Sequence, residues 1–209
     1  MEGPIFYRNF LNDIVDLMFS IRVKSPEIQK YRKEVTLKDG DILLFRPITP
    51  DDDQKVLELY YSLSPETIYF RFFAGRKNVP LKRVKRFTRV NFDKNFGVVV
   101  EYKGKDKEFF NKLIGIGSFI VNPLEPEKAE MSLVIMDRFQ RKGIGSILIN
   151  YLVHIAKERG VKTIQGIILA ENYKILKTLE KLGFKYVKKL IEGELLIEGS
   201  VDEIEKSSN

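Results

Sequence analysis

Cysteine is absent from this sequence of 209 residues, and histidine occurs once, as His154. Without cysteine there is no disulfide, no thiol nucleophile and no zinc site built on thiolates. One histidine cannot form a histidine cluster around a metal, and it gives little support to a serine–histidine triad. We therefore expect no metal, and we expect any chemistry to use carboxylates, hydroxyls, amines or backbone groups.

Long apolar runs are also missing from the sequence. No stretch approaches the roughly 20 apolar residues that cross a membrane. The first residues mix apolar side chains with Glu2, Arg8, Asp13 and Asp16, which is not the pattern of a signal peptide. We expect a cytoplasmic protein that does not associate with a membrane. The formal charge of +7 and the pI of about 9.3 favour acidic partners, either nucleic acid or an anionic cofactor and acidic protein patches.

What the sequence does contain is a clear strand–turn–helix pattern between Ala129 and Tyr151. Residues 129–136 are apolar and rich in branched side chains, so they predict a buried strand with one carboxylate, Glu130, near its start. The turn Gln-Arg-Lys-Gly-Ile-Gly, residues 140–145, then leads into a helix whose apolar residues recur with helical spacing. The rest of the chain is best understood around this stretch.

The glycine-rich turn predicts a phosphate-binding site. Gly143 and Gly145 let successive backbone N–H groups point into one concavity, where the positive end of the helix dipole attracts anions. Arg141 and Lys142 add charge where a pyrophosphate would lie. Other phosphate loops fit poorly, because a Walker A loop needs a lysine between the second glycine and Ser146, and a dinucleotide fingerprint needs a third glycine.

The same residues carry a resemblance to a family. A strand that opens Ala129-Glu130, followed by Gln140-x-x-Gly143-x-Gly145, resembles the acetyl-CoA-binding motif of the GNAT acetyltransferase superfamily. The helix ending Lys-Leu-Gly-Phe at 181–184 is similar to another feature of that superfamily. The runs LLFRPITPDDD (43–53) and SLSPETIYFRFF (62–73) resemble a branch of it, the bacterial and archaeal protein lysine acetyltransferases.

The resemblance covers roughly residues 36–199 and implies an α/β (α+β) fold, with a mixed, mostly antiparallel central sheet flanked by helices. We divide the chain into an N-terminal helical arm (1–34), a GNAT acetyltransferase domain (35–200) and a frayed charged tail (201–209). The apolar stripe of the arm predicts a helix that packs on its own domain. The alternative is an arm that forms a homodimer or docks a partner.

Local patterns predict the elements of the domain. Asp39-Gly40 is a hairpin turn within 35–48, and two helices start at Thr49-Pro50 and Ser64-Pro65, each with a residue suited to capping followed by proline. The helix predicted at 80–89 carries five basic residues, which either contact phosphates or form a solvated face over an apolar stripe. The other elements expected are strands at 96–102, 113–121 and 163–169, helices at 143–159 and from 172 to 182, and a hairpin of 186–191 with 194–200.

The resemblance also implies how acetyl-CoA binds. The pantetheine would enter a gap between the central strand and strand 163–169, and pair as an extra strand with the backbone of Leu133, Val134 and Ile135. Asn172 matches a position that often hydrogen-bonds the cofactor. The pyrophosphate would lie on the amides of Arg141, Lys142, Gly143, Ile144, Gly145 and Ser146.

Glu130 matches the position of the family's general base. A lysine amine has an ordinary pKa of about 10.4 and must lose a proton before it attacks a thioester. A carboxylate in an apolar strand can accept that proton, and burial would raise its pKa. The alternative is a structural glutamate paired with a nearby lysine or arginine. One departure concerns the leaving group, because the family's usual tyrosine acid is replaced here by Leu179, and Tyr173 lies in the first turn of that helix.

Three functions remain open at this stage. The first is a protein lysine acetyltransferase whose partner is a protein with an accessible lysine, such as an acyl-CoA synthetase. The second is an acetyltransferase for small amines. The third is a non-catalytic protein that binds acetyl-CoA or nucleic acid, of which nucleic acid is the less favoured ligand.

Overall fold

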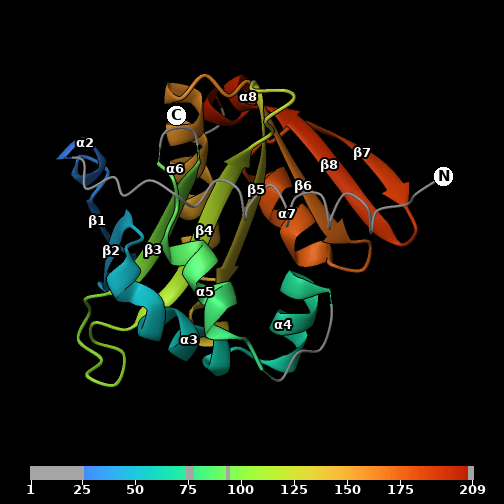
Figure 1. Cartoon of the computed structure of the whole chain (residues 1–209). Helices are drawn as coiled ribbons and strands as arrows, with labels where there is room; N and C mark the ends of the chain where they lie inside the picture. The colour runs from blue at the N-terminus through green and yellow to red at the C-terminus, as the bar shows by residue number, and fades with distance from the viewer. Residues whose placement is uncertain (1–25, 74–77, 93–94, 207–209) are drawn as a thin grey trace.

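The computed structural model describes residues 26–73, 78–92 and 95–206, and within them one mixed sheet forms the centre of the molecule (Figure 1). The eight strands lie in the order β1-β2-β3-β4-β5-β6-β8-β7. The strands are β1 Lys33–Thr36, β2 Ile42–Pro47, β3 Phe96–Tyr102, β4 Leu113–Val121, β5 Lys128–Ile135, β6 Thr163–Leu169, β7 Tyr186–Ile191 and β8 Glu194–Ser200. The helices are α2 Pro26–Gln29, η1 Pro50–Asp52, α3 Asp53–Ser62, α4 Pro65–Phe72, α5 Leu81–Thr88, η2 Asp137–Phe139, α6 Ile144–Glu158, α7 Tyr173–Lys181 and α8 Val201–Lys206.

Strands β5 and β6 are parallel, and every other neighbouring pair in the sheet is antiparallel. The pairing between β5 and β6 is limited to the first residues of the two strands, and it ends where Glu130 lies opposite Gln165. Beyond that point β5 continues to Ile135 beside β4, and β6 continues to Leu169 beside β8. The two strands therefore diverge in the middle of the sheet.

Helices cover both faces of the sheet. Helix α6 packs closely on one face, since a Cβ at Gly117 of β4 would lie 2.8 Å from Leu152 Cδ1 and 3.1 Å from Leu148 Cδ2. Ser118 points to the opposite face, as neighbouring strand residues must, and Figure 1 shows α3, α4 and α5 on that side. Buried residues lie on both faces of the sheet: Val98, Phe119, Leu148 and Leu152, on the α6 side, are inaccessible to solvent, and Leu59 of α3 and Val84 of α5 are 2% exposed.

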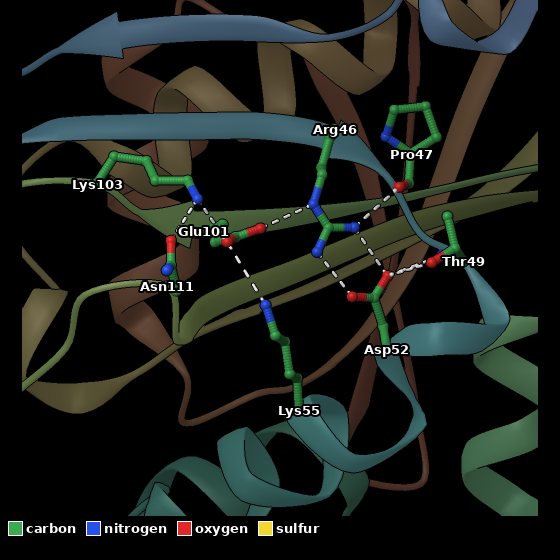
Figure 2. A network of polar contacts seen from close by, with 8 residues as sticks. All are labelled: Arg46, Pro47, Thr49, Asp52, Lys55, Glu101, Lys103 and Asn111. Carbon is green, nitrogen blue, oxygen red and sulfur yellow. Dashed lines mark hydrogen bonds and ion pairs between the residues drawn. The ribbon is translucent and has the colours of Figure 1, made fainter.

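A buried ionic network fixes the junction between β2, β3 and the start of α3 (Figure 2). The Arg46 guanidinium donates from Nη1 and Nη2 to Asp52 (2.8 and 2.7 Å) and from Nε to Glu101 Oε2 at 2.9 Å. Asp52 also accepts from the Thr49 amide at 2.8 Å, and Lys103 Nζ lies 2.7 Å from Glu101. Burial alone would raise the pKa of Glu101, but the hydrogen bonds from Lys103 and Arg46 hold that pKa below its ordinary value.

The predicted elements agree with the structure at most positions. The strands predicted at 96–102, 113–121, 163–169, 186–191 and 194–200 are found with those bounds. Residues near both ends of the described part of the chain pack into the domain. Ile28 and Tyr31, assigned to the arm, are buried in the domain core. Val201, placed at the start of a frayed tail, is 2% exposed and begins α8, because its amide donates to the Lys162 carbonyl and its side chain packs in the core. The apolar stripe predicted within residues 1–21 lies outside the described residues.

Candidate active site

A cavity of about 1390 Å³ opens where β5 and β6 diverge, and α4, α7 and the N-terminus of α6 complete its walls. Glu130 of β5 and the glycine-rich turn before α6 both line this cavity, although they belong to different elements. The predicted residues that line the cavity are Glu130, Leu133, Val134, Ile135, Arg141, Gly143, Gly145, Ser146 and Asn172.

The glycine-rich turn presents an open face to the cavity. Gly143 is the N-cap of α6 and has a φ of +83°, a conformation that a β-branched side chain adopts only with strain. A Cβ at Gly143 would meet no atom within 4 Å, and one at Gly145 would meet only Leu133 Cδ1 at 3.9 Å. Helix α6 is 15 residues long, so the amides of its first turn carry the positive end of a substantial dipole. The turn is therefore shaped and charged to receive an anion.

Gln140 holds this turn in place. Its side-chain amide donates to the Ile135 carbonyl at 3.0 Å and to the Thr67 hydroxyl at 3.1 Å. The first bond ties the turn to the end of β5, and the second ties it to the first turn of α4. The sequence pattern includes Gln140 but gives no indication of these partners.

Asp137 joins the same turn to α4 more strongly. Its carboxylate accepts from the Ser64 amide at 2.9 Å, from the Ser64 hydroxyl at 2.6 Å and from the Thr67 hydroxyl at 2.7 Å. Burial acts to raise the pKa of Asp137, and the bonds from Ser64 and Thr67 outweigh it and lower that pKa. Sequence reasoning missed this role, because Asp137 stands out only as the residue that ends the apolar strand.

Two residues of the predicted phosphate site have side chains that lie elsewhere. The Lys142 ammonium is 2.7 Å from Asp39 Oδ2 and 3.3 Å from Asp41 Oδ2, so it links α6 to the β1–β2 turn. Ile144 is 1% exposed and belongs to the core. These positions can offer a backbone amide to an anion. The side-chain charge at the turn that lines the cavity comes from Arg141.

The side of the cavity formed by α4 contains an arginine that sequence analysis did not identify. Glu130 and Ser132 point to the same face of β5, because they are two residues apart in a strand. Arg71 of α4 donates from Nη2 to Ser132 Oγ at 2.8 Å, and Ser118 Oγ of β4 lies 3.3 Å from the same oxygen. Burial lowers the pKa of Arg71, and the nearby charge of Glu130 acts in the opposite direction.

Helix α7 closes the cavity beside β6. Asn172 is its N-cap residue and makes no side-chain capping bond, so its amide remains available to the cavity that it lines. Leu179 lines the cavity with an alkyl side chain, as the sequence predicts, while Tyr173 is 59% exposed at the first turn. A hydroxyl acid at position 179 is therefore excluded.

No group of three or more histidine, cysteine, aspartate or glutamate residues that could hold a metal ion occurs in the described ranges. Across residues 26–73, 78–92 and 95–206, no helix combines the length and the apolar character needed to span a membrane.

A cavity between two diverging strands, reached by the amides of a helix N-terminus, is suited to an extended molecule with a phosphorylated end. Residues 58–184 match the Acetyltransferase (GNAT) family, and the chain belongs to that family. The predicted fold is confirmed by the GNAT domain of S. lividans PAT, which superposes with a TM-score of 0.72 at 25% identity over 82% of this chain and 97% of that one.

Two curated relatives give the same assignment. Acetyltransferase Pat of Mycolicibacterium smegmatis is 27% identical over 155 residues, which are 74% of this chain and 44% of Pat. Acetyltransferase PA5475 of Pseudomonas aeruginosa is 24% identical over 151 residues, 71% of this chain and 78% of that protein. The match thus spans less than half the length of Pat.

Proposed function

We propose that this protein is an N-acetyltransferase that moves the acetyl group of acetyl-CoA to a primary amine, namely a lysine side chain of a protein. The observation that carries the proposal is the single cavity in which a carboxylate, Glu130, shares the gap between β5 and β6 with the open turn at Gly143 and Gly145. An anion site and a proton acceptor within one cavity are what transfer from a phosphorylated thioester to an amine requires.

The cavity residues fit acetyl-CoA in three respects. The amides of residues 141–146, with Arg141, supply donors and charge for the pyrophosphate. The backbone of Leu133, Val134 and Ile135 lies past the last pair with β6, so an extended pantetheine can add to β5 as a strand. Asn172 supplies an amide from the opposite wall. When bound, acetyl-CoA supplies the activated acyl group as its thioester.

Glu130 is proposed as the general base. It takes a proton from the acceptor, directly or through a water, so that the neutral amine nitrogen can bond to the thioester carbonyl carbon. The nitrogen then gives its second proton to solvent, the carbon–sulfur bond breaks, and the electron pair of that bond leaves with the sulfur. Because Leu179 offers no proton, the thiolate is protonated from solvent, and a thiol of ordinary pKa near 8.5 is a good leaving group without a dedicated acid.

We infer a protein lysine as acceptor from the residues of α4 and from the surface around the cavity opening. Helix α4 contains the run that resembles protein lysine acetyltransferases, and it contributes Phe70, Arg71 and Phe72 to the cavity wall. Tyr69 and Tyr173 are exposed, at 41% and 59%, on the two helices that flank the opening. Such aromatic side chains supply contact area for a folded partner. The relatives named Pat support the same class, and an acyl-CoA synthetase is the partner that we propose to test.

The experiment is an acetylation assay with the full chain, acetyl-CoA and an acyl-CoA synthetase, followed by mass spectrometry of the acceptor lysines. Spermidine and free amino acids serve as competing acceptors. We expect acetylation at one or a few lysines of the synthetase, and faster turnover than with any small amine. Faster turnover of a small amine than of every protein tested would assign the protein to small-molecule acetylation instead.

A further inference from the structure

The position of Arg71 has a consequence for the reaction, which rests on the function proposed above. Arg71 of α4 donates a hydrogen bond to Ser132, on the face of β5 that carries Glu130. The bond from Nη2 to Ser132 Oγ brings the guanidinium to a strand position two residues from Glu130, inside the same cavity. The two side chains interact electrostatically.

The helix that carries Arg71 is itself fixed to the site. Asp137 accepts three hydrogen bonds from Ser64 and Thr67 at the N-terminus of α4, and Glu66 pairs with Lys174 of α7 at 2.6 Å. These contacts hold α4 at both neighbouring walls of the cavity. The position of Arg71 relative to β5 is therefore defined by the placement of its helix.

We propose that Arg71 is a positioning residue for the transfer, whose guanidinium, held by Ser132, keeps the Glu130 carboxylate in its ionised, proton-accepting form. A general base is useful only in the fraction of molecules in which it is unprotonated. A glutamate in a partly buried strand tends to lose that form, because burial disfavours its charge. A fixed cation nearby counters this tendency.

Other charged groups near Glu130 have contacts with further residues. On its own strand, Lys128 lies 2.9 Å from Glu125 and 3.8 Å from Glu198 of β8. From β6, Glu130 faces the neutral Gln165. Glu66 and Asp137 are bound to Lys174 and to the hydroxyls of α4, respectively. The remaining cations that line the cavity are Arg83, Arg141, Lys177 and Lys181.

The test measures the titration of Glu130 itself, by carbon-13 NMR of labelled glutamate carboxyls. The Glu130 signal is assigned by its loss in Glu130→Gln. An opposite charge within a few ångströms typically lowers a carboxyl pKa by about 1–3 units. We expect Arg71→Met, which keeps an unbranched helix-forming side chain, to raise the titration midpoint of Glu130 by at least about one unit. Arg71→Lys keeps the charge and should retain most of the lower midpoint.

Two further variants complete the design. Lys82→Gln removes an exposed cation from the neighbouring helix α5 and should leave the midpoint unmoved. Ser132→Ala releases the guanidinium from β5 and should raise the midpoint by less than Arg71→Met does. If Arg71→Met does not fold, the titration midpoint of Glu130 in Ser132→Ala decides whether the proposal holds. A midpoint equal to that of the wild type in every folded variant would overturn the proposal and make Arg71 a structural anchor.

The pH dependence of turnover gives a second readout. With N-α-acetyl-lysine amide as acceptor, the acid limb of the kcat/KM profile should move to higher pH in Arg71→Met and stay in place in Lys82→Gln. A uniform loss of activity without movement of the limb would contradict the proposal. The NMR titration needs no turnover, so it still decides the role of Arg71 if the wild type transfers no acetyl group and the proposed function fails.

Discussion

Two arginines, Arg46 and Arg71, each lie beside a glutamate of the central sheet, and their surroundings differ. Arg46 is 9% exposed and donates to the buried carboxylates of Asp52 and Glu101. Arg71 donates to a serine hydroxyl at the wall of a large cavity, and its charge interacts with that of Glu130, which lines the same cavity. The first arrangement is buried within the protein, and the second lines a cavity that is large enough for a substrate to enter.

The comparison separates stability from chemistry. A buried charge must be paired, and breaking such a pair is costly, so the Arg46 network resists change. A carboxylate that acts as a general base must instead be within reach of the proton that it accepts from a substrate. Variants of the two sites test whether the Arg46 network contributes mainly to stability and the Glu130 site mainly to turnover.

The largest expected effect is on turnover in Glu130→Gln. This change keeps size and removes basicity, so turnover at neutral pH should fall by about 10²–10⁴-fold, the usual contribution of a general base. Acetyl-CoA affinity and thermal stability should stay close to those of the wild type. The deficit should shrink as pH rises, because more of the acceptor amine is already neutral. Glu127→Gln, which removes an exposed carboxylate paired with Lys162, is the control, and near-normal turnover of Glu130→Gln at every pH would refute its role as base.

Arg46→Met should act on stability instead. It leaves Asp52 and part of Glu101 buried without their cation, so the free energy of unfolding should fall by about 3–5 kcal/mol. Urea unfolding monitored by circular dichroism measures this loss. The Kd for acetyl-CoA of the molecules that remain folded should be unchanged. A loss below about 1 kcal/mol, the range of exposed ion pairs, would show that the network is not an effective buried pair.

The same network predicts a pH dependence of stability. The pKa of Glu101 is lower in the folded protein than its ordinary value of 4.5. Its contribution is therefore complete above pH 4.5 and is lost as the pH falls through the lower folded value. The wild type should lose stability below that pH more steeply than Arg46→Met, in which the shift of Glu101 is reduced. Parallel acid-unfolding curves for the two proteins would be evidence against this assignment.

Gly143→Val should weaken acetyl-CoA binding. A β-branched side chain is strained at a φ of +83° and occupies the open face of the turn, so we expect the Kd from calorimetry to rise by tenfold or more. Gly160, which follows the C-terminal end of α6, is a matched control. Its φ is +80°, and a Cβ added there would meet no atom within 4 Å. Gly160→Val should cost similar stability and leave the Kd unchanged, and equal Kd values in the two variants would exclude the turn as the phosphate site.

The smallest effect is expected for Lys142→Gln. Its ammonium pairs with Asp39 and Asp41 outside the cavity, and exposed ion pairs contribute about 1 kcal/mol or less. The Kd for acetyl-CoA should therefore change less than threefold, a fraction of 1 kcal/mol. Arg141→Gln, beside it in the turn, should weaken binding more. The reverse order in calorimetry would restore Lys142 as the cation of the phosphate site.

Much of this protein can be predicted from sequence, because the signals are local. Branched apolar runs, the Ser64-Pro65 helix start and the glycines at 143 and 145 each depend on neighbouring residues, and the strand bounds and the turn follow from them. The sequence also shows Glu130 as a lone carboxylate in an apolar strand, and its role as general base stays a prediction.

What the tertiary structure decided is the set of contacts between distant segments. The divergence of β5 and β6, the hydrogen bonds from Ser64 and Thr67 to Asp137 and the bond from Arg71 to β5 join residues that have no local pattern in common. The same applies to Lys142, whose local setting predicts a phosphate contact while Asp39 and Asp41 draw it away. Charged side chains are long and choose partners by proximity in space, and that proximity is fixed only when the sheet and its helices pack together.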